Sequence, residues 1–175
     1  MSRSLDDLTL EMKNKAVNVK KYCNLRGVDL LIYYTKRTLK EQAILFRQSY
    51  KDYQIIKNKI VKLENMGFDF LAKILKDVGP QIYTGWVTNA GPGESWHNFS
   101  EAFDAVPCEG KDCLWSYEGN EKEWDIYRDA VKSEGLTWGG DFPDKIKDRP
   151  HAQLRSYGNP LRLYTPEEIK KMLRL

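Results

Sequence analysis

The sequence predicts an α+β fold in which a small, mainly antiparallel sheet is flanked by helices. Three observations support this prediction. Apolar residues recur at helical spacing in several segments, and short runs rich in β-branched and aromatic residues lie between these segments. In addition, an apolar stretch over about residues 50–81 is broken by Gly67, which is typical of a helical hairpin.

The first part of the chain is expected to alternate helix, strand and helix. Ser4 can cap a helix that begins near Leu5, and Gly27 ends it because glycine tolerates a positive φ. Residues 28–34 predict the first buried strand, and Thr38 caps a second helix. The buried face of the first helix is expected to comprise Leu8, Met12, Ala16, Val19 and Cys23.

The second part is expected to contain short strands and two helices. One strand ends at Val106 and Pro107, and residues 114–116 predict another. A helix over residues 121–134 ends at Gly135, and a short terminal helix opens at Thr165. We therefore expect a single domain over residues 1–155, followed by a tail with a short helix over residues 156–175.

The composition favours a globular protein over a membrane protein or a dedicated nucleic-acid binder. Of the 175 residues, 41% are hydrophobic and 12% aromatic, which suffices for a packed core. The formal net charge is only +3, with acidic and basic residues interspersed. No apolar run approaches the roughly 20 residues of a membrane-spanning helix. Residues 1–8 lack the pattern of a secretory signal, so we expect synthesis in the cytoplasm without a signal peptide.

The three cysteines, Cys23, Cys108 and Cys113, leave at least one thiol unpaired within a monomer. This fits a reducing compartment better than a disulfide scaffold. Cys108 and Cys113 could still pair with each other, bind a metal or remain plain thiols, and their spacing does not decide among these alternatives.

Both histidines of the chain lie in short polar motifs that also contain an aspartate. His97 precedes Asp104 by seven positions, and Asp148 precedes His151 by three. A catalytic zinc usually takes three protein ligands from His, Asp, Glu or Cys and leaves a fourth position for water. His97, Asp104 and His151 would fill this role, which leaves Asp148 for proton transfer.

Spacing alone does not fix how His97 and Asp104 are arranged. Seven residues would place them on one face of a helix, but on opposite faces of an ideal strand. Because residues 91–93 read Gly-Pro-Gly and residues 103–107 alternate like a strand, we expect His97 at a loop edge and Asp104 on a strand. We also expect His151 on a strand. The alternative is a polar loop in which His97 and Asp104 merely hydrogen-bond.

Arg37 lies where the first predicted strand gives way to the second helix. Loops at strand ends often present functional groups, and a guanidinium there can hold a substrate carboxylate through two hydrogen bonds. The alternative is a solvated arginine, since most surface arginines contribute little.

These motifs together resemble a known family. The pattern Ser95-x-His97-x6-Asp104 followed by Asp148-x-x-His151, with Arg37 upstream and Trp-Gly-Gly-Asp at residues 138–141, is similar to the zinc D-alanyl-D-alanine carboxypeptidase and L-alanyl-D-glutamate peptidase family. Phage endolysins and vancomycin-resistance peptidases belong to that family. The resemblance covers most of residues 2–154, and residues 2–8 look like the start of the endolysin branch.

The resemblance implies a Zn²⁺ site whose ligands are His97, Asp104 and His151, with Asp148 as the general acid/base. It also implies that Arg37 anchors the substrate, with supporting roles at most for Ser95 and Gln42. The implied substrate is the stem peptide of peptidoglycan, so the protein would act on the cell wall, either in phage lysis or after another route of export. We expect no nucleic-acid partner and a monomer.

Two features bear on the finer function. Carboxypeptidases of this family usually carry glutamate where this chain has Asp148, whereas the endolysin branch carries aspartate, which favours cleavage of the L-Ala-D-Glu bond. The hairpin over residues 50–81 looks inserted relative to compact members of the family. The alternatives are a D-Ala-D-Ala carboxypeptidase or dipeptidase of the same family, and a non-catalytic zinc-containing binding module.

Overall fold

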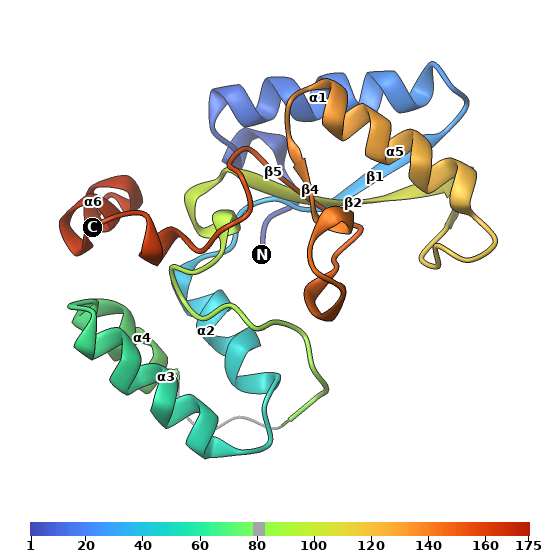
Figure 1. Ribbon diagram of the computed structural model, residues 1–175. Helices are drawn as coiled ribbons and strands as arrows, with labels where there is room; N and C mark the ends of the chain where they lie inside the picture. The colour runs from blue at the N-terminus through green and yellow to red at the C-terminus, as the bar shows by residue number, and fades with distance from the viewer. Residues whose placement is uncertain (79–82) are drawn as a thin grey trace. The chain divides into compact units, whose positions relative to one another are not determined.

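The computed structural model describes residues 1–78 and 83–175. The chain divides into two compact units, of which the first comprises Met1–Lys36 and Ser100–Tyr157 and the second comprises Arg37–Phe99 and Gly158–Leu175. The first unit carries a five-stranded sheet with two helices, and the second unit is helical (Figure 1). The predicted α+β fold class is therefore confirmed.

The sheet of the first unit is antiparallel throughout the described pairings. Its strand order is β1-β2-β5-β4, and the short strand β3, which lies off this path, pairs with the last residues of β2. β2 lies between β1 and β5, so the longest strand is also central. The strands are β1 (Asp29–Tyr34), β2 (Ala102–Glu109), β3 (Asp112–Cys113), β4 (Thr137–Trp138) and β5 (His151–Gln153).

Two helices, α1 (Leu10–Asn24) and α5 (Glu121–Ser133), lie side by side over one face of this sheet (Figure 1). Each helix turns one apolar stripe toward the sheet, as the helical spacing of the sequence predicts. The buried residues of the two stripes are Met12, Ala16, Val19, Cys23, Trp124, Tyr127, Ala130 and Val131.

The start of the first helix differs from the prediction. Ser4 caps a short 3₁₀ turn, Leu5–Asp7, and the α-helix begins only at Leu10. Leu8 is extended (φ −83°, ψ 158°), and the side chain of Thr9 caps α1 by accepting from the Met12 N–H. The chain has two capping residues in succession, so the first cap serves the shorter turn.

The strands β2 and β3 also differ from the prediction. β2 continues past Pro107 to Glu109, because Pro107 keeps a carbonyl that accepts from the Leu114 N–H at 2.9 Å. The strand expected over residues 114–116 is wrong, since the pairing partner of β2 is Asp112–Cys113. A disulfide joins Cys108 and Cys113, so the interpretations as plain thiols or as metal ligands are wrong for this pair.

Cys23 is the free cysteine, and it is buried in the core of the first unit. Burial there raises the pKa of its thiol to about 12. Cys23 is therefore neutral and packs as a small apolar side chain.

The second unit contains the predicted helical hairpin. α3 (Tyr53–Asn65) and α4 (Asp69–Asp77) pack against each other, and Gly67 between them has φ +79°. The unit also holds α2 (Leu39–Gln48) and α6 (Pro166–Leu173). The last residues of the predicted hairpin, 79–81, lie outside the described residues. No helix within the described ranges is both long and apolar enough to cross a membrane.

Capping explains where α2 and α6 begin. Thr38 and Thr165 each accept a hydrogen bond from the N–H three residues on, and Glu41 and Glu168 reach back to the cap residue's own N–H. These reciprocal bonds form capping boxes, and the predicted starts of both helices are confirmed.

Candidate metal centre

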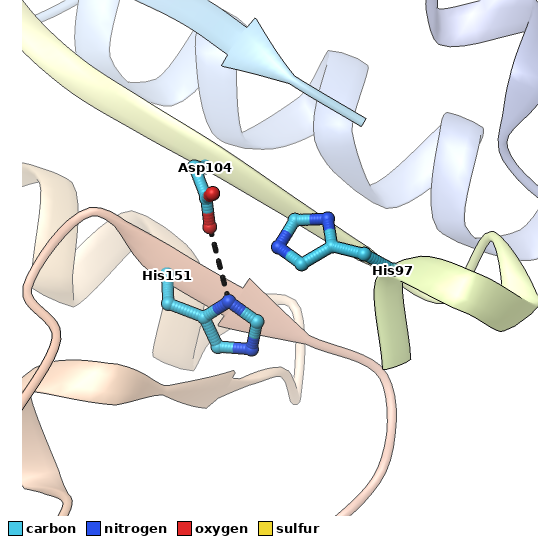
Figure 2. A group of neighbouring side chains, drawn as sticks. All are labelled: His97, Asp104 and His151. Atoms are coloured by element: carbon cyan, nitrogen blue, oxygen red, sulfur yellow. Dashed lines mark hydrogen bonds and ion pairs between the residues drawn. The ribbon is translucent and has the colours of Figure 1, made fainter. Parts of the chain in front are cut away.

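His97, Asp104 and His151 form one buried cluster. Their candidate ligand atoms, one from each residue, all lie within 4.8 Å of one another. Figure 2 shows the His97 ring pointing toward the pair formed by Asp104 and His151. Two imidazoles and a carboxylate are a donor set that suits zinc, so the chemistry of the residues fits the metal that the sequence motifs imply.

β2 and β5 place Asp104 and His151 beside each other. The two residues are direct partners in the antiparallel register, so their side chains emerge on the same face of the sheet. His151 Nδ1 lies 3.0 Å from Asp104 Oδ1. Burial by itself lowers the pKa of His151, but the hydrogen bond and negative charge of Asp104 outweigh it, and the pKa is raised above its ordinary value.

His97 lies in a short 3₁₀ turn, η2 (Trp96–Phe99), which ends before β2 begins. The carbonyl of His97 accepts from the Arg37 N–H at 3.2 Å, and the Asn98 side-chain amide donates to the Arg37 carbonyl at 3.0 Å. Asn98 Oδ1 accepts from the Gly93 N–H at 2.9 Å. Asp104 lies on a strand as expected, and His97, which was expected at a loop edge, lies in this short turn.

The Asp148–His151 turn is fixed through main-chain atoms. The Asp148 N–H donates to the Gly139 carbonyl at 2.9 Å, and the Trp138 indole N–H donates to the Arg149 carbonyl at 2.7 Å. The Tyr127 hydroxyl donates to the Pro150 carbonyl at 2.8 Å. Asp148 itself is exposed, and its charge acts on His151.

The segment before this turn requires a glycine at position 139, because there is no room for a side chain. A Cβ at Gly139 would overlap the Asp148 carbonyl oxygen and would lie 2.9 Å from His151 Cβ. The sequence marked residues 138–141 only through the family resemblance. The physical reason is this close approach of two backbone segments.

The other predicted residues occupy different surroundings. Arg37 is half-buried, and its backbone contacts η2. Gln42 is fully buried, and its amide donates to the Ala90 carbonyl at 2.8 Å. Ser95 is half-buried, and its carbonyl accepts from the Asn98 N–H at 3.0 Å. The described metal-ligand cluster includes none of these three residues.

Sequence reasoning missed Gln153 as a residue of the site. Its side-chain oxygen lies 3.0 Å from His151 Nε2, on the opposite side of the ring from Asp104. The available signal was its position two residues after His151 on a predicted strand, which places both side chains on one face.

Comparisons with known proteins agree with the family resemblance. A family described as D-alanyl-D-alanine carboxypeptidase matches residues 88–154. The chain is 27% identical over 154 residues to the peptidoglycan L-alanyl-D-glutamate endopeptidase CwlK of Bacillus subtilis (strain 168), covering 85% of this chain and 74% of that protein.

Two solved structures are similar to this chain. The first is the L-Ala D-Glu endopeptidase ChiX of Serratia marcescens, at 17% identity and a TM-score of 0.43, covering 88% of this chain and 87% of that chain. The second is a mutant of the vancomycin resistance D,D-pentapeptidase VanY in complex with Zn(II), at 14% identity and a TM-score of 0.46, covering 96% of this chain and 79% of that chain.

The matched segment contains His97, Asp104, Asp148 and His151, which are the histidines and aspartates of the two polar motifs. The resemblance inferred from the sequence is therefore confirmed: residues 88–154 match the family described as D-alanyl-D-alanine carboxypeptidase.

Proposed function

We propose that this protein is a zinc-dependent peptidoglycan peptidase that hydrolyses the stem peptide. The buried cluster of His97, Asp104 and His151 carries this proposal, because it offers the three-ligand set of a catalytic zinc site. Zinc, when bound, supplies a Lewis acid that lowers the pKa of water to roughly 7 and polarises a peptide carbonyl.

Side chains of the protein carry out proton transfer and bind the substrate. The Asp148 carboxylate accepts a proton from the attacking water and then delivers it to the leaving amine, so water is added across the C–N bond of the peptide. Arg37 holds a carboxylate of the stem peptide and orients the substrate. The exposed position of Asp148 supports its role, because proton transfer requires access to substrate and water.

Cleavage of the L-Ala-D-Glu bond is the specificity that we propose. The relative from Bacillus subtilis is described as an L-alanyl-D-glutamate endopeptidase, and Asp148 stands where the endolysin branch carries aspartate. The family description, D-alanyl-D-alanine carboxypeptidase, supports the alternative. Mass spectrometry of digested peptidoglycan separates the two: a new D-Glu amino terminus identifies the endopeptidase, and loss of a terminal D-Ala identifies the carboxypeptidase.

Two substitutions test the division of roles within the site. Asp148→Ala is expected to keep zinc but to lower kcat by roughly 10²- to 10⁴-fold, since it removes only the acid/base. His151→Ala is expected to lose both zinc and hydrolysis. Zinc content by mass spectrometry and turnover of a purified muropeptide are the measurements.

Asp144→Ala is the matched control for Asp148→Ala. Asp144 lies in the same segment, is exposed, and forms an ion pair with Lys147 at 2.8 Å. Its removal is expected to leave turnover unchanged. Full turnover by Asp148→Ala would contradict the assignment of the acid/base. A zinc-loaded wild-type protein that cleaves no muropeptide would instead favour the non-catalytic binding module.

A further inference from the structure

The side-chain amide of Gln153 can adopt only one orientation. Gln153 is buried, with 4% of its surface exposed. Its Nε2 lies 2.9 Å from the Arg155 carbonyl oxygen and 2.9 Å from the Ser156 carbonyl oxygen. Carbonyl oxygens only accept hydrogen bonds, so the NH₂ group must face them. The amide oxygen must consequently face His151.

This orientation determines which nitrogen of His151 keeps its hydrogen when a metal ion binds. Gln153 Oε1 lies 3.0 Å from His151 Nε2, and an amide oxygen can only accept. Nε2 must therefore donate. Nδ1 also faces an acceptor, the Asp104 carboxylate, and donates to it. A metal ion that binds takes the place of the hydrogen on its ligand nitrogen, so a hydrogen retained on Nε2 leaves Nδ1 as the ligand. Nδ1 is the nitrogen that faces Asp104, at 3.0 Å from its carboxylate.

We propose that Gln153 is the positioning residue of the metal centre: its amide oxygen keeps the His151 proton on Nε2 and presents Nδ1 to the metal. This inference rests on the proposed zinc site and adds which ring nitrogen of His151 is the ligand. The partner on the far side of a ligating histidine fixes both the tautomer and the ring orientation, and its loss typically weakens metal binding by 10- to 100-fold.

The segment after β5 holds the Gln153 amide in place. The Arg155 guanidinium makes two hydrogen bonds to the Glu101 carboxylate, at 2.8 and 2.9 Å, and Glu101 is itself buried. The Leu154 N–H also donates to the Glu101 carbonyl at 2.9 Å. Glu101 therefore supports the same segment as Gln153 through its contacts with Arg155 and Leu154. This makes it a suitable site for a control.

The first experiment measures Zn²⁺ affinity by competition with a chelator. Gln153→Met keeps the length of the side chain and removes the acceptor, so we expect zinc binding to weaken 10- to 100-fold. Glu101→Gln perturbs the same segment, and we expect it to bind zinc as tightly as the wild type. Equal affinity of Gln153→Met and wild type would overturn the proposal, as would an equal loss in Glu101→Gln.

The second experiment reads the tautomer directly and does not depend on the folding of a variant. Nitrogen-15 NMR of the zinc-loaded wild type is expected to show His151 protonated at Nε2 and bound to zinc through Nδ1. A zinc bond at Nε2 would overturn the proposal. Failure of the wild type to bind zinc at all would instead contradict the zinc site on which the proposal rests.

Discussion

At the scale of single residues, the site depends on how closely two backbone segments approach. The turn that carries Asp148 lies against Gly139, whose carbonyl accepts from the Asp148 N–H at 2.9 Å. The contacts from Trp138 and Tyr127 also fix main-chain atoms of this turn. The side chain of Asp148 is thereby left exposed while its backbone is held in place.

Gly139→Ala is expected to destabilise the protein by about 1–3 kcal/mol, the usual cost of adding a methyl group where no space exists. The new Cβ would overlap the Asp148 carbonyl oxygen, so the turn must move, and we also expect weaker zinc binding and slower hydrolysis. Urea denaturation and zinc titration are the measurements.

Gly158→Ala is the matched control for this substitution. A Cβ at Gly158 would lie 3.8 Å from Leu163 Cδ1, an ordinary contact, and we expect stability within about 0.5 kcal/mol of the wild type. The account of the turn would be wrong if Gly139→Ala were as stable as Gly158→Ala.

Part of the candidate site could be predicted from the sequence, because its residues are of metal-ligating types. Histidine is rare in this chain, and both copies lie in aspartate-containing motifs, so His97, Asp104 and His151 stood out. Gln153 did not, because a glutamine on a strand is most often an ordinary polar residue. Its role follows only from the distance between its amide oxygen and His151 Nε2.

At the scale of elements, Glu94 ties the hairpin to the segment that leads into η2. Its carboxylate accepts hydrogen bonds from Lys59 on α3, from the Gly91 N–H at 2.8 Å and from the Asn159 side-chain amide at 2.9 Å. Both charged side chains are largely buried, with 6% of Glu94 and 16% of Lys59 exposed. The helical hairpin therefore stabilises the loop before His97, which lies in the same unit, through the contact of Lys59 with Glu94.

Glu94→Gln is expected to reduce stability by roughly 1.5–3 kcal/mol near neutral pH, because it replaces a charged hydrogen-bond acceptor with a neutral one. Glu64→Gln is the control, since Glu64 pairs with Lys76 at 2.5 Å on the surface, with 36% and 51% of the two side chains exposed. We expect a smaller loss for that pair, because solvent screens the two exposed charges. Urea denaturation compares the two variants, and equal losses would contradict this stabilising role of Glu94.

The same contacts predict a dependence on pH. Burial alone raises the pKa of Glu94, but the charge of Lys59 and the hydrogen bonds outweigh it and hold the pKa below 4.5. A carboxylate whose pKa is lower in the folded state stabilises the fold above its unfolded value, and the contribution disappears as the pH falls through the folded value. The stability difference between wild type and Glu94→Gln should therefore shrink in acid below pH 4.5. A constant difference across this range would contradict the prediction.

Most elements followed from local sequence signals. The caps at Thr38 and Thr165 located two helix starts, and Gly27 and Gly135, with φ +76° and +68°, located two ends. The errors occurred where local signals were ambiguous: Ser4 and Thr9 can both cap a helix, and the apolar residues at 114 and 115 indicated a strand, whereas the strand that forms is Asp112–Cys113. There the outcome depends on pairing with distant segments.

At the scale of the whole molecule, zinc binding is expected to stabilise the folded protein. A ligand that binds only the folded state adds about 2.7 kcal/mol when its concentration is a hundredfold above Kd. The thermal midpoint of the wild type should rise with added zinc and fall with a chelator, whereas His151→Ala should show neither change. A wild-type thermal midpoint that changes with neither zinc nor the chelator would contradict the metal site.

The grouping of the chain into two units lies beyond what local patterns can predict. The single domain over residues 1–155 with a tail over residues 156–175 stays a prediction. In the structure, Gly158–Leu175 groups with Arg37–Phe99. Contacts such as the Asn159 amide with Glu94 and the Trp96 indole with the Gly158 carbonyl join segments more than 60 residues apart. Patterns in a single sequence report on local structure and leave such long-range contacts undetermined.

Side chains of β5 alternate between the apolar core and the metal-ligand cluster, so core packing also determines which side chains face the cluster. His151 and Gln153 lie on one face of this strand, and Ala152 between them belongs to the core, as does Phe103 opposite it on β2. A slip of one residue would bury an imidazole and an amide among α1 and α5 and turn Ala152 toward Asp104. Each buried polar group without a partner costs about 1–3 kcal/mol, so packing on the far face selects the register that assembles the site.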